Sequence, residues 1–298
     1  MLIDLHADLF LSPADVWIMP VSTAGAASTE VAADFKRFFP SALAQYRLAC
    51  EVGDMKPGSL LYLRGDGVDI LALPIRRHWR SAADADMLEA GLQKLADRWP
   101  DLAIPSLALP RFASAELNWD EGVRPLLDTY LDPLPIPVYV HHNHPTDMRR
   151  GVRQIEQRVT HTHFRPPFEQ FWRDLGRVIR TVYGKFSTPS GEAFRAAVET
   201  GARVRRLVVT PDRGPAYAFS SAVLSDFWTQ ALHARLVFPH QLTGGMEQAA
   251  SYVFPVLAQL GYLSTVRGTM SGRAESDALL FTPPAPKGTT ILAVEVAP

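Results

Sequence analysis

Short apolar runs alternate with longer amphipathic segments along the first half of the chain. The short runs predict strands and the amphipathic segments predict helices, because the two structures bury side chains at different periods. The predicted strands are 16–19, 60–63, 68–73, 103–109 and 138–140, and the predicted helices are 30–39, 41–52, 84–99 and 120–130. This alternation indicates a largely parallel or mixed sheet with helices on both faces and ligands at the carboxyl ends of its strands.

Residues at the ends of these segments support the predicted elements. Ser28 is placed to cap the helix 30–39, and Pro40 interrupts that helix. Gly53 follows the end of the next helix, where a glycine commonly stops helical structure.

A polar segment, 141–147, interrupts the apolar pattern and contains Pro145, so we expect a linker or turn there. The chain is longer than one typical domain, and we expect domains 1–144 and 145–298. In the second half the pattern predicts helices 152–159, 168–183, 190–200, 221–234 and 245–260, and strands 204–209 and 290–296. The predicted fold class is α/β: a three-layer α/β/α first domain followed by an α+β or α/β domain.

Charge is distributed unevenly along the chain. Residues 1–140 carry 12 Lys or Arg against 19 Asp or Glu, whereas residues 141–298 carry 18 against 12. Arginine dominates the basic segment 149–213, which suits bidentate phosphate recognition and equally suits ion pairs with the acidic half. Nucleic-acid binding by this segment is therefore a hypothesis, with its candidate residues Arg149, Arg150, Arg153, Arg173 and Arg177.

The single cysteine, Cys50, excludes an internal disulfide and a thiolate zinc cage, and its helical surroundings favour a packed residue over a nucleophile. No basic, apolar leader opens the sequence, and no run of about 18 apolar residues is present. We therefore expect a cytoplasmic protein that does not bind membranes.

Several separated segments resemble one known family. The segments 35–40 (Phe-Lys-Arg-Phe-Phe-Pro) and 46–58 have its helix, proline break and return into a strand. The segments 73–80 (Leu-Pro-Ile-Arg-Arg-His-Trp-Arg), 89–92 and 117–121 continue the match in the same order. On these segments, residues 1–142 resemble a macrodomain, in particular that of the DarG-like DNA ADP-ribosyl glycohydrolase antitoxins. The second half resembles no family that we recognise.

The resemblance implies an ADP-ribose-like ligand and a set of residues that hold it. Asp8 stands where an acidic side chain accepts a hydrogen bond from the adenine amino group. Ser22 replaces the asparagine expected at the distal ribose. The loop that follows keeps Gly25 and small residues such as Ser28, whose backbone amides are available to a phosphate.

The second phosphate loop departs from the family pattern. Its glycine-rich segment is replaced by 111–117 (Arg-Phe-Ala-Ser-Ala-Glu-Leu), whose side chains hinder a close approach of backbone to pyrophosphate. Glu116 repels a diphosphate, whereas Arg111 offers a guanidinium in place of lost amide donors. We keep Arg111 and Ser114 as candidate ligand-binding residues of this loop.

Arg76 occupies the position where the resemblance places a catalytic lysine. Arginine stays protonated and has no lone pair, so it cannot act as the nucleophile or base at the ribose C1′. Lysine-dependent glycohydrolase activity is therefore disfavoured. Two roles for Arg76 remain open: phosphate binding without turnover, and a purely electrostatic or structural role.

Other polar clusters carry weaker hypotheses. Histidines and Asp147 within 141–147 offer metal ligands, but their spacing matches no specific site and favours a polar turn. Ser190 is placed to cap the helix 190–200, and an anion at that helix start is a further alternative. We predict no metal and no cofactor, and the chain has no nucleophile elbow, Walker loop or dinucleotide fingerprint.

The leading hypothesis is a macrodomain-derived pseudoenzyme of a bacterial conflict setting, such as a toxin–antitoxin or phage-defence system. It binds an ADP-ribose-like nucleotide or ADP-ribosylated nucleic acid, and a protein partner is also considered. One alternative is an active DNA ADP-ribosyl glycohydrolase in which another residue replaces the lysine. The other is an inert macrodomain scaffold, with partner binding or chemistry in the second domain near 210–215 or 243–247.

Overall fold

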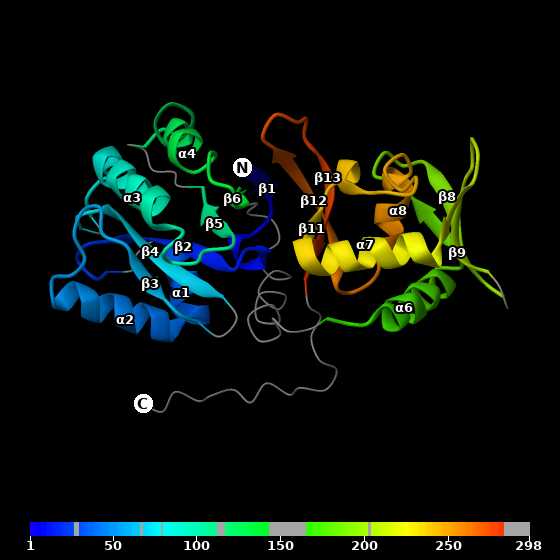
Figure 1. The fold of residues 1–298 in the computed structure, drawn as a ribbon, viewed down its shortest axis with the longest axis horizontal. Coiled ribbons are helices and arrows are strands. Elements are labelled where there is room, and N and C mark those ends of the chain that lie inside the picture. The colour runs from blue at the N-terminus through cyan, green and yellow to red at the C-terminus, as the bar shows by residue number, and fades with distance from the viewer. Residues whose placement is uncertain are drawn as a thin grey trace.

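The computed structural model describes residues 1–26, 30–65, 68–78, 80–111, 117–142, 165–201 and 204–282. Its central feature is a nine-stranded sheet that runs through both halves of the chain (Figure 1). The strands follow the order β11-β13-β12-β1-β6-β5-β2-β4-β3. From the first half come β1 (Leu2–His6), β2 (Val16–Ser22), β3 (Leu61–Leu63), β4 (Asp69–Arg76), β5 (Leu107–Pro110) and β6 (Val138–His141). From the second half come β11 (Leu236–Val237), β12 (Leu263–Met270) and β13 (Ser276–Phe281).

Five strands of the first half form a parallel group. In it β1 pairs parallel with β6, β6 with β5, β5 with β2 and β2 with β4. β3 and β12 pair antiparallel at the two sides of this group. The carboxyl ends of β1, β2, β4, β5 and β6 consequently lie along one edge of the sheet, here called the carboxyl edge. Their amino ends lie along the opposite edge.

Helices cover both faces of this part of the sheet (Figure 1). One face carries α1 (Glu30–Phe38) and α2 (Pro40–Glu51), and the other carries α3 (Ala85–Arg98) and α4 (Arg124–Tyr130). All seven residues of β2 are buried, since both of its faces are covered. The first half is therefore a three-layer α/β/α arrangement, as predicted.

Apolar spacing explains which helix faces pack inward. Phe35, Phe39 and Tyr46 bury their rings against one face of the sheet. Leu88 and Leu95 of α3 are fully buried against the other face. Such burial is the main stabilising contribution to the three-layer arrangement of the first half.

The described residues of the second half add a separate four-stranded sheet and the helices α6, α7 and α8. Its order is β10-β9-β8-β7, with every neighbouring pair antiparallel. The strands are β7 (Lys185–Ser187), β8 (Ala193–Thr200), β9 (Arg205–Pro211) and β10 (Tyr217–Ser220), and the helices are α6 (Phe168–Thr181), α7 (Ser221–Ala234) and α8 (Ala250–Leu257). Trp228, Phe254 and Leu279 belong to its buried core, which reaches β13 of the large sheet. This half is α+β, which is one of the two predicted classes.

Antiparallel pairing of β1 with β12 joins the two halves, with Ile3 opposite Met270 and Leu5 opposite Gly268. A Cβ at Gly268 would lie 2.9 Å from the Asp4 carbonyl oxygen and 2.8 Å from Leu5 Cδ2. Only a glycine permits this close approach of backbone and side chain. The predicted domain boundary at residue 144 lies outside the described residues, and the division into two domains stays a prediction.

The prediction of a helix at 190–200 is wrong. Residues 193–200 form β8, in which Phe194 and Ala196 are buried while their neighbours are exposed. This alternation has the period of a strand, so burial of one strand face decides against the helix. Ser190 lies in the turn between β7 and β8, with its hydroxyl 2.9 Å from that of Thr188, and caps no helix.

Other predicted elements agree with the structure. α7 spans the predicted residues 221–234, Pro40 is the first residue of α2, and Gly53 adopts a positive φ of 81° after that helix. The predicted helix 152–159 and strand 290–296 lie outside the described residues. The sequence pattern missed β1 within the large sheet, and it missed β11, β12 and β13, the strands that extend this sheet into the second half.

Within the described residues, no helix is both long and apolar enough to cross a bilayer.

We predict that Gly268→Ala lowers the free energy of unfolding by about 1–3 kcal/mol, because the added methyl group must displace the β1 backbone. Urea denaturation followed by tryptophan fluorescence measures the change. Gly261→Ala is the matched control, since a Cβ there has no neighbour within 4 Å. Equal stability of the two variants would contradict the inferred close contact.

Candidate functional site

The carboxyl edge brings together four of the residues singled out by the sequence. Asp8 follows β1, Ser22 ends β2, Arg76 ends β4 and Arg111 follows β5. Gly25 lies in the loop after β2. Ligands of open α/β sheets bind outside the carboxyl ends of the strands, so this edge is the candidate site. Ser28 and Ser114 lie outside the described residues.

The loop after β2 is held by helix α2. The Tyr46 hydroxyl donates a hydrogen bond to the Ser22 carbonyl oxygen over 2.6 Å and lies 3.4 Å from the Ser22 hydroxyl. Gly25 has a φ of 77°, and a Cβ there would lie 3.3 Å from Cys50 Cβ. This close contact and the positive φ explain why a glycine is retained in the loop.

The same loop is tied to the end of β4. The Thr23 amide donates to the Arg76 carbonyl oxygen over 3.0 Å, and the Thr23 hydroxyl donates to the Arg77 carbonyl oxygen over 2.9 Å. A register irregularity at the end of β2 pairs Ser22 with Arg76. The Arg76 side chain is half-buried, whereas Arg77 is exposed. Arg76 thus places a permanent positive charge beside the loop, and the described residues offer it no ion-pair partner.

Asp8 caps the short 3-10 helix η1 (Leu9–Leu11), since its Oδ1 accepts the Phe10 amide over 2.9 Å. Burial raises the pKa of this carboxyl group, and the hydrogen bond from Phe10 opposes that effect. Oδ2 remains as a second acceptor oxygen. Asp8 therefore has the chemistry that the resemblance implies for an adenine amino group.

An ionic cluster lies next to Arg111, on the α4 side of the edge. The Arg111 guanidinium is 5.3 Å from the Trp119 ring centroid, and the Trp119 ring meets the His142 ring edge-on. His142 Nε2 lies 2.9 Å from Asp4 Oδ1, and Arg124 donates to Asp4 Oδ2 over 2.7 Å. Although burial opposes ionisation, these partners hold the pKa of Asp4 below its usual value.

Sequence reasoning missed Asp4 as a site residue and considered His142 only as a metal ligand. The signal that could have found Asp4 is its charge within the otherwise apolar start of β1. Its partners are His142, which follows β6, and Arg124 of α4, and both are distant from Asp4 in sequence.

His141 is fully buried at the end of β6, and its Nδ1 lies 3.2 Å from the Ala7 carbonyl oxygen. Because a carbonyl only accepts hydrogen bonds, the proton is on Nδ1. Nε2 is a buried side-chain atom without a hydrogen-bond partner. Burial lowers the pKa of His141 to about 4, so the ring is neutral at pH 7.

Neither the histidine segment nor Cys50 shows signs of metal or thiolate chemistry among the described residues. No group of three His, Cys, Asp or Glu side chains in that part of the chain is arranged to hold a metal ion. Residues 143–147 of the segment lie outside it. Burial raises the pKa of Cys50, so its thiol stays protonated.

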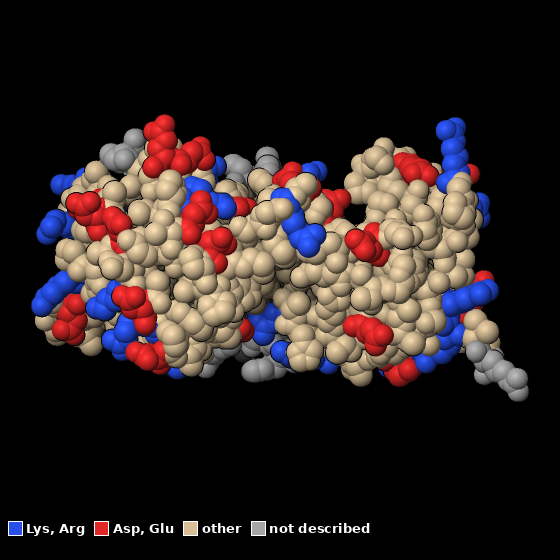
Figure 2. All heavy atoms as spheres, turned by 45° about the horizontal axis from the view of Figure 1, so that its top comes forward, with Lys and Arg blue, Asp and Glu red and all other residues tan. Residues whose placement is uncertain are grey.

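The arginines proposed to bind nucleic acid are placed only in part. Arg149, Arg150 and Arg153 lie outside the described residues. Arg173 and Arg177 lie on α6, and they bond to Gln170 and Asp174 of the same helix over 2.8 and 3.0 Å. On the face shown in Figure 2, acidic and basic side chains are interspersed over both halves. Contact of the five candidate arginines with nucleic acid stays a prediction.

The chain matches no protein-family model. It is 32% identical over 123 residues to a DNA ADP-ribosyl glycohydrolase of Thermus aquaticus, a match that covers 39% of this chain and 34% of the relative. It is 26% identical over 158 residues to a DNA ADP-ribosyl transferase–DNA ADP-ribosyl glycohydrolase fusion protein of Thermosipho africanus, covering 46% and 40%. The matches thus span only about a third to two-fifths of the length of these relatives.

Among solved structures, the chain is similar to the macrodomain of Thermus aquaticus DarG, with 28% identity, a TM-score of 0.45 and coverage of 48% of this chain and 98% of that one. It is also similar to Thermosipho africanus DarTG in complex with ADP-ribose, with 23% identity, a TM-score of 0.46 and coverage of 51% and 44%. The relatives named DNA ADP-ribosyl glycohydrolase confirm the resemblance inferred from the first half.

We predict that His141 makes the protein less stable at acidic pH. Between pH 7 and pH 5 the unfolded chain binds a proton at the ordinary pKa of 6.5, whereas the folded chain, with a pKa of about 4, does not. The free energy of unfolding should therefore fall by about 2 kcal/mol more in the native protein than in His141→Gln. Urea denaturation at both pH values measures this difference, and equal losses would contradict the burial of a neutral imidazole.

Proposed function

We propose that the first half binds ADP-ribose, free or attached to nucleic acid, at the carboxyl edge, and that it does so without lysine-dependent hydrolysis. The observation that carries the proposal is Arg76 at the end of β4, beside the loop after β2, in a chain similar to DNA ADP-ribosyl glycohydrolases. The site keeps a cation where the family resemblance implies a lysine.

Each group at the edge has a role in this proposal. Asp8 Oδ2 accepts the adenine amino group, and the loop around Gly25 presents backbone amides to the diphosphate. Because Tyr46 and Thr23 already hold this loop, little conformational entropy is lost when ligand binds. Arg76 neutralises phosphate charge with a guanidinium that forms two hydrogen bonds at once.

Arg76 cannot act as the nucleophile or base of a hydrolysis reaction, because its guanidinium stays protonated. A nucleophile or base at the ribose C1′ needs a lone pair, and the guanidinium has none at physiological pH. The ligand therefore stays bound instead of being cleaved. Such a protein senses or shields ADP-ribosylated nucleic acid.

The resemblance of the first half to the DarG-like antitoxins supports a proposal about the wider setting. We propose a role in a bacterial toxin–antitoxin or phage-defence system, in the cytoplasm, with the first domain at 1–144 and a basic second domain at 145–298. Contact of that second domain with nucleic acid or a protein partner belongs to the same proposal. Its support is the excess of basic over acidic residues in the second half.

We predict that Arg76→Ala weakens ADP-ribose binding by about tenfold or more, because a charge-assisted contact with phosphate is lost. Isothermal titration calorimetry with the full chain measures the dissociation constant. Arg77→Ala is the matched control and should change it less than about threefold, since that neighbouring side chain is exposed. Absence of heat at millimolar ADP-ribose would reject the nucleotide-binding proposal.

We also predict that the native protein releases no ADP-ribose from an ADP-ribosylated oligonucleotide, whereas Arg76→Lys releases it measurably. The reason is that lysine regains a lone pair when it loses its proton, and arginine does not. Chromatographic detection of free ADP-ribose distinguishes the two. Release by the native protein would instead support an active glycohydrolase that uses another residue.

If binding occurs but neither Asp8→Asn nor Arg76→Ala changes it, the scaffold alternative is favoured. The ligand would then be sought near 210–215 or 243–247.

A further inference from the structure

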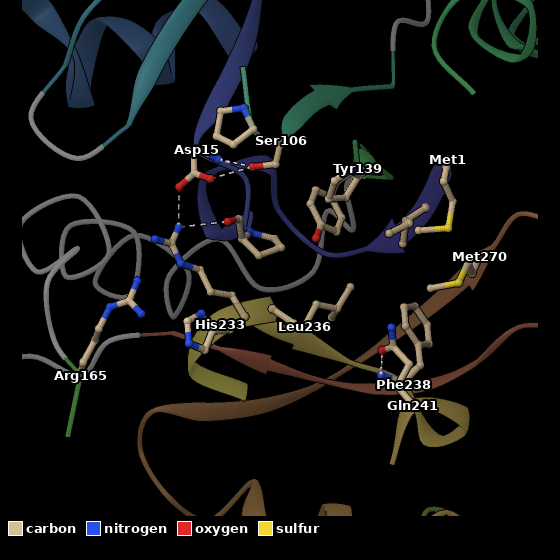
Figure 3. Close-up of a pocket in the computed structure, with 16 residues that line it drawn as sticks. Met1, Asp15, Ser106, Tyr139, Arg165, His233, Leu236, Phe238, Gln241 and Met270 are labelled. Carbon is tan, nitrogen blue, oxygen red and sulfur yellow. Dashed lines mark hydrogen bonds and ion pairs between the residues drawn. The ribbon is translucent and has the colours of Figure 1, made fainter. Parts of the chain in front are cut away.

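A cavity lies at the amino ends of the parallel strands, opposite the carboxyl edge, where both halves of the chain meet (Figure 3). Its volume is about 380 Å³. Met1, Asp15, Ser106 and Pro137 line it from positions that precede β1, β2, β5 and β6. The end of α7, β11 and β12 of the second half close its other side. The cavity is therefore separate from the carboxyl edge and depends on the junction of the two halves.

An unpaired hydroxyl group faces this cavity. Tyr139 of β6 is only 5% exposed, and Figure 3 shows its hydroxyl pointing into the hollow. Among the described residues this hydroxyl has no hydrogen-bond partner. Burial raises the pKa of Tyr139, so the group stays protonated and can donate. The hydroxyl is not among the buried polar atoms without a partner, so it is accessible from the cavity, and an acceptor oxygen of a ligand there can receive its hydrogen bond.

The acidic group at the cavity is already neutralised. Asp15 Oδ1 lies 3.1 Å from the Arg235 guanidinium, and its Oδ2 accepts the Ser106 hydroxyl over 2.9 Å. Arg235 also donates to the Pro13 carbonyl oxygen over 3.1 Å, which fixes its position. Asp15 and Arg235 thus form the wall of the cavity and contribute little net charge to it.

The remaining charge at the cavity is positive. Arg165 reaches it from the segment before α6 and makes one contact of 3.4 Å with the Leu232 carbonyl oxygen at the end of α7. His233 lies on the same side of the cavity (Figure 3). The exposed Arg165 guanidinium keeps further N–H groups for an anion.

The opposite side of the cavity is apolar. Leu236, Phe238 and Met270 line it together with Ile3 of β1. All four are at least nine-tenths buried in the folded chain. An apolar wall facing a cation and a hydroxyl matches a small ligand with an apolar body and one acidic group.

We infer that this cavity binds a small organic carboxylate whose aromatic or branched aliphatic body packs against Leu236, Phe238 and Met270. Its carboxylate accepts a hydrogen bond from the Tyr139 hydroxyl, and the Arg165 guanidinium at the side of the cavity attracts its negative charge. Because β1, β11 and β12 all line the site, the bound ligand contacts both halves of the chain at their junction.

The test uses the full chain and 3-phenylpropionate as the probe, with 3-phenylpropanamide as its uncharged counterpart and inorganic phosphate as an anion without an apolar body. Isothermal titration calorimetry should show binding of the acid, binding at least about tenfold weaker for the amide, and none for phosphate. Absence of acid binding at about 10 mM, or equal binding of acid and amide, overturns the inference.

Two variants locate the probe. Tyr139→Phe preserves the ring and should weaken acid binding about five- to tenfold. Arg165→Gln should weaken it about two- to threefold, because an exposed cation attracts the carboxylate only through solvent. Arg195→Gln, at an exposed position of β8, is the control and should leave binding unchanged. Acid binding that neither Tyr139→Phe nor Arg165→Gln alters would place the probe elsewhere and overturn the assignment.

A parallel titration separates this inference from the proposed function. Tyr139→Phe should leave ADP-ribose binding unchanged, because the carboxyl edge lies at the other end of the strands. If Tyr139→Phe loses acid binding and keeps ADP-ribose binding, the cavity is a second site. If this variant loses both, the cavity is not independent of the carboxyl edge.

Discussion

Strand β1 is hydrogen-bonded on both of its sides, and the rest of the structure depends on that placement. On one side it pairs parallel with β6, and on the other it pairs antiparallel with β12. The first pairing positions Asp8 at the carboxyl edge beside the strands that carry the other candidate residues. The second extends the sheet into the second half, and the glycine opposite Leu5 makes the close approach possible.

Both candidate sites arise from this one sheet. Parallel strands gather polar residues at their carboxyl ends, where loops are free to vary without disturbing the core. At the amino ends, the residues that precede β1, β2, β5 and β6 line one side of a cavity, and the end of α7, β11 and β12 line the other. The two sites therefore differ in origin: the strands of one half supply the first, and the junction of both halves supplies the second.

In the proposed function, binding and catalysis at the carboxyl edge depend on different chemical groups. The loop after β2 is held by hydrogen bonds from the Tyr46 hydroxyl and the Thr23 amide to backbone carbonyl oxygens. These bonds do not depend on the side chain of Arg76. Exchange of a lysine for an arginine preserves charge but removes the ability to lose a proton. A site can therefore keep its affinity for an anion while it loses the group that acts as nucleophile or base in cleavage.

The sequence by itself determined most elements of the first half, although not β1, and the family resemblance selected Asp8, Ser22, Arg76 and Arg111 as candidate site residues. The spacing of apolar residues identifies such strands and helices from local sequence. Parallel pairing of the strands then places their carboxyl ends along one edge of the sheet. It also determined the chemistry of Arg76, since a guanidinium is protonated in any surroundings. Only the tertiary structure decided that 193–200 is a strand, that β12 joins β1, and that Asp4 meets His142 and Arg124. These outcomes depend on burial and on contacts between segments far apart in the chain, for which no local pattern carries the information.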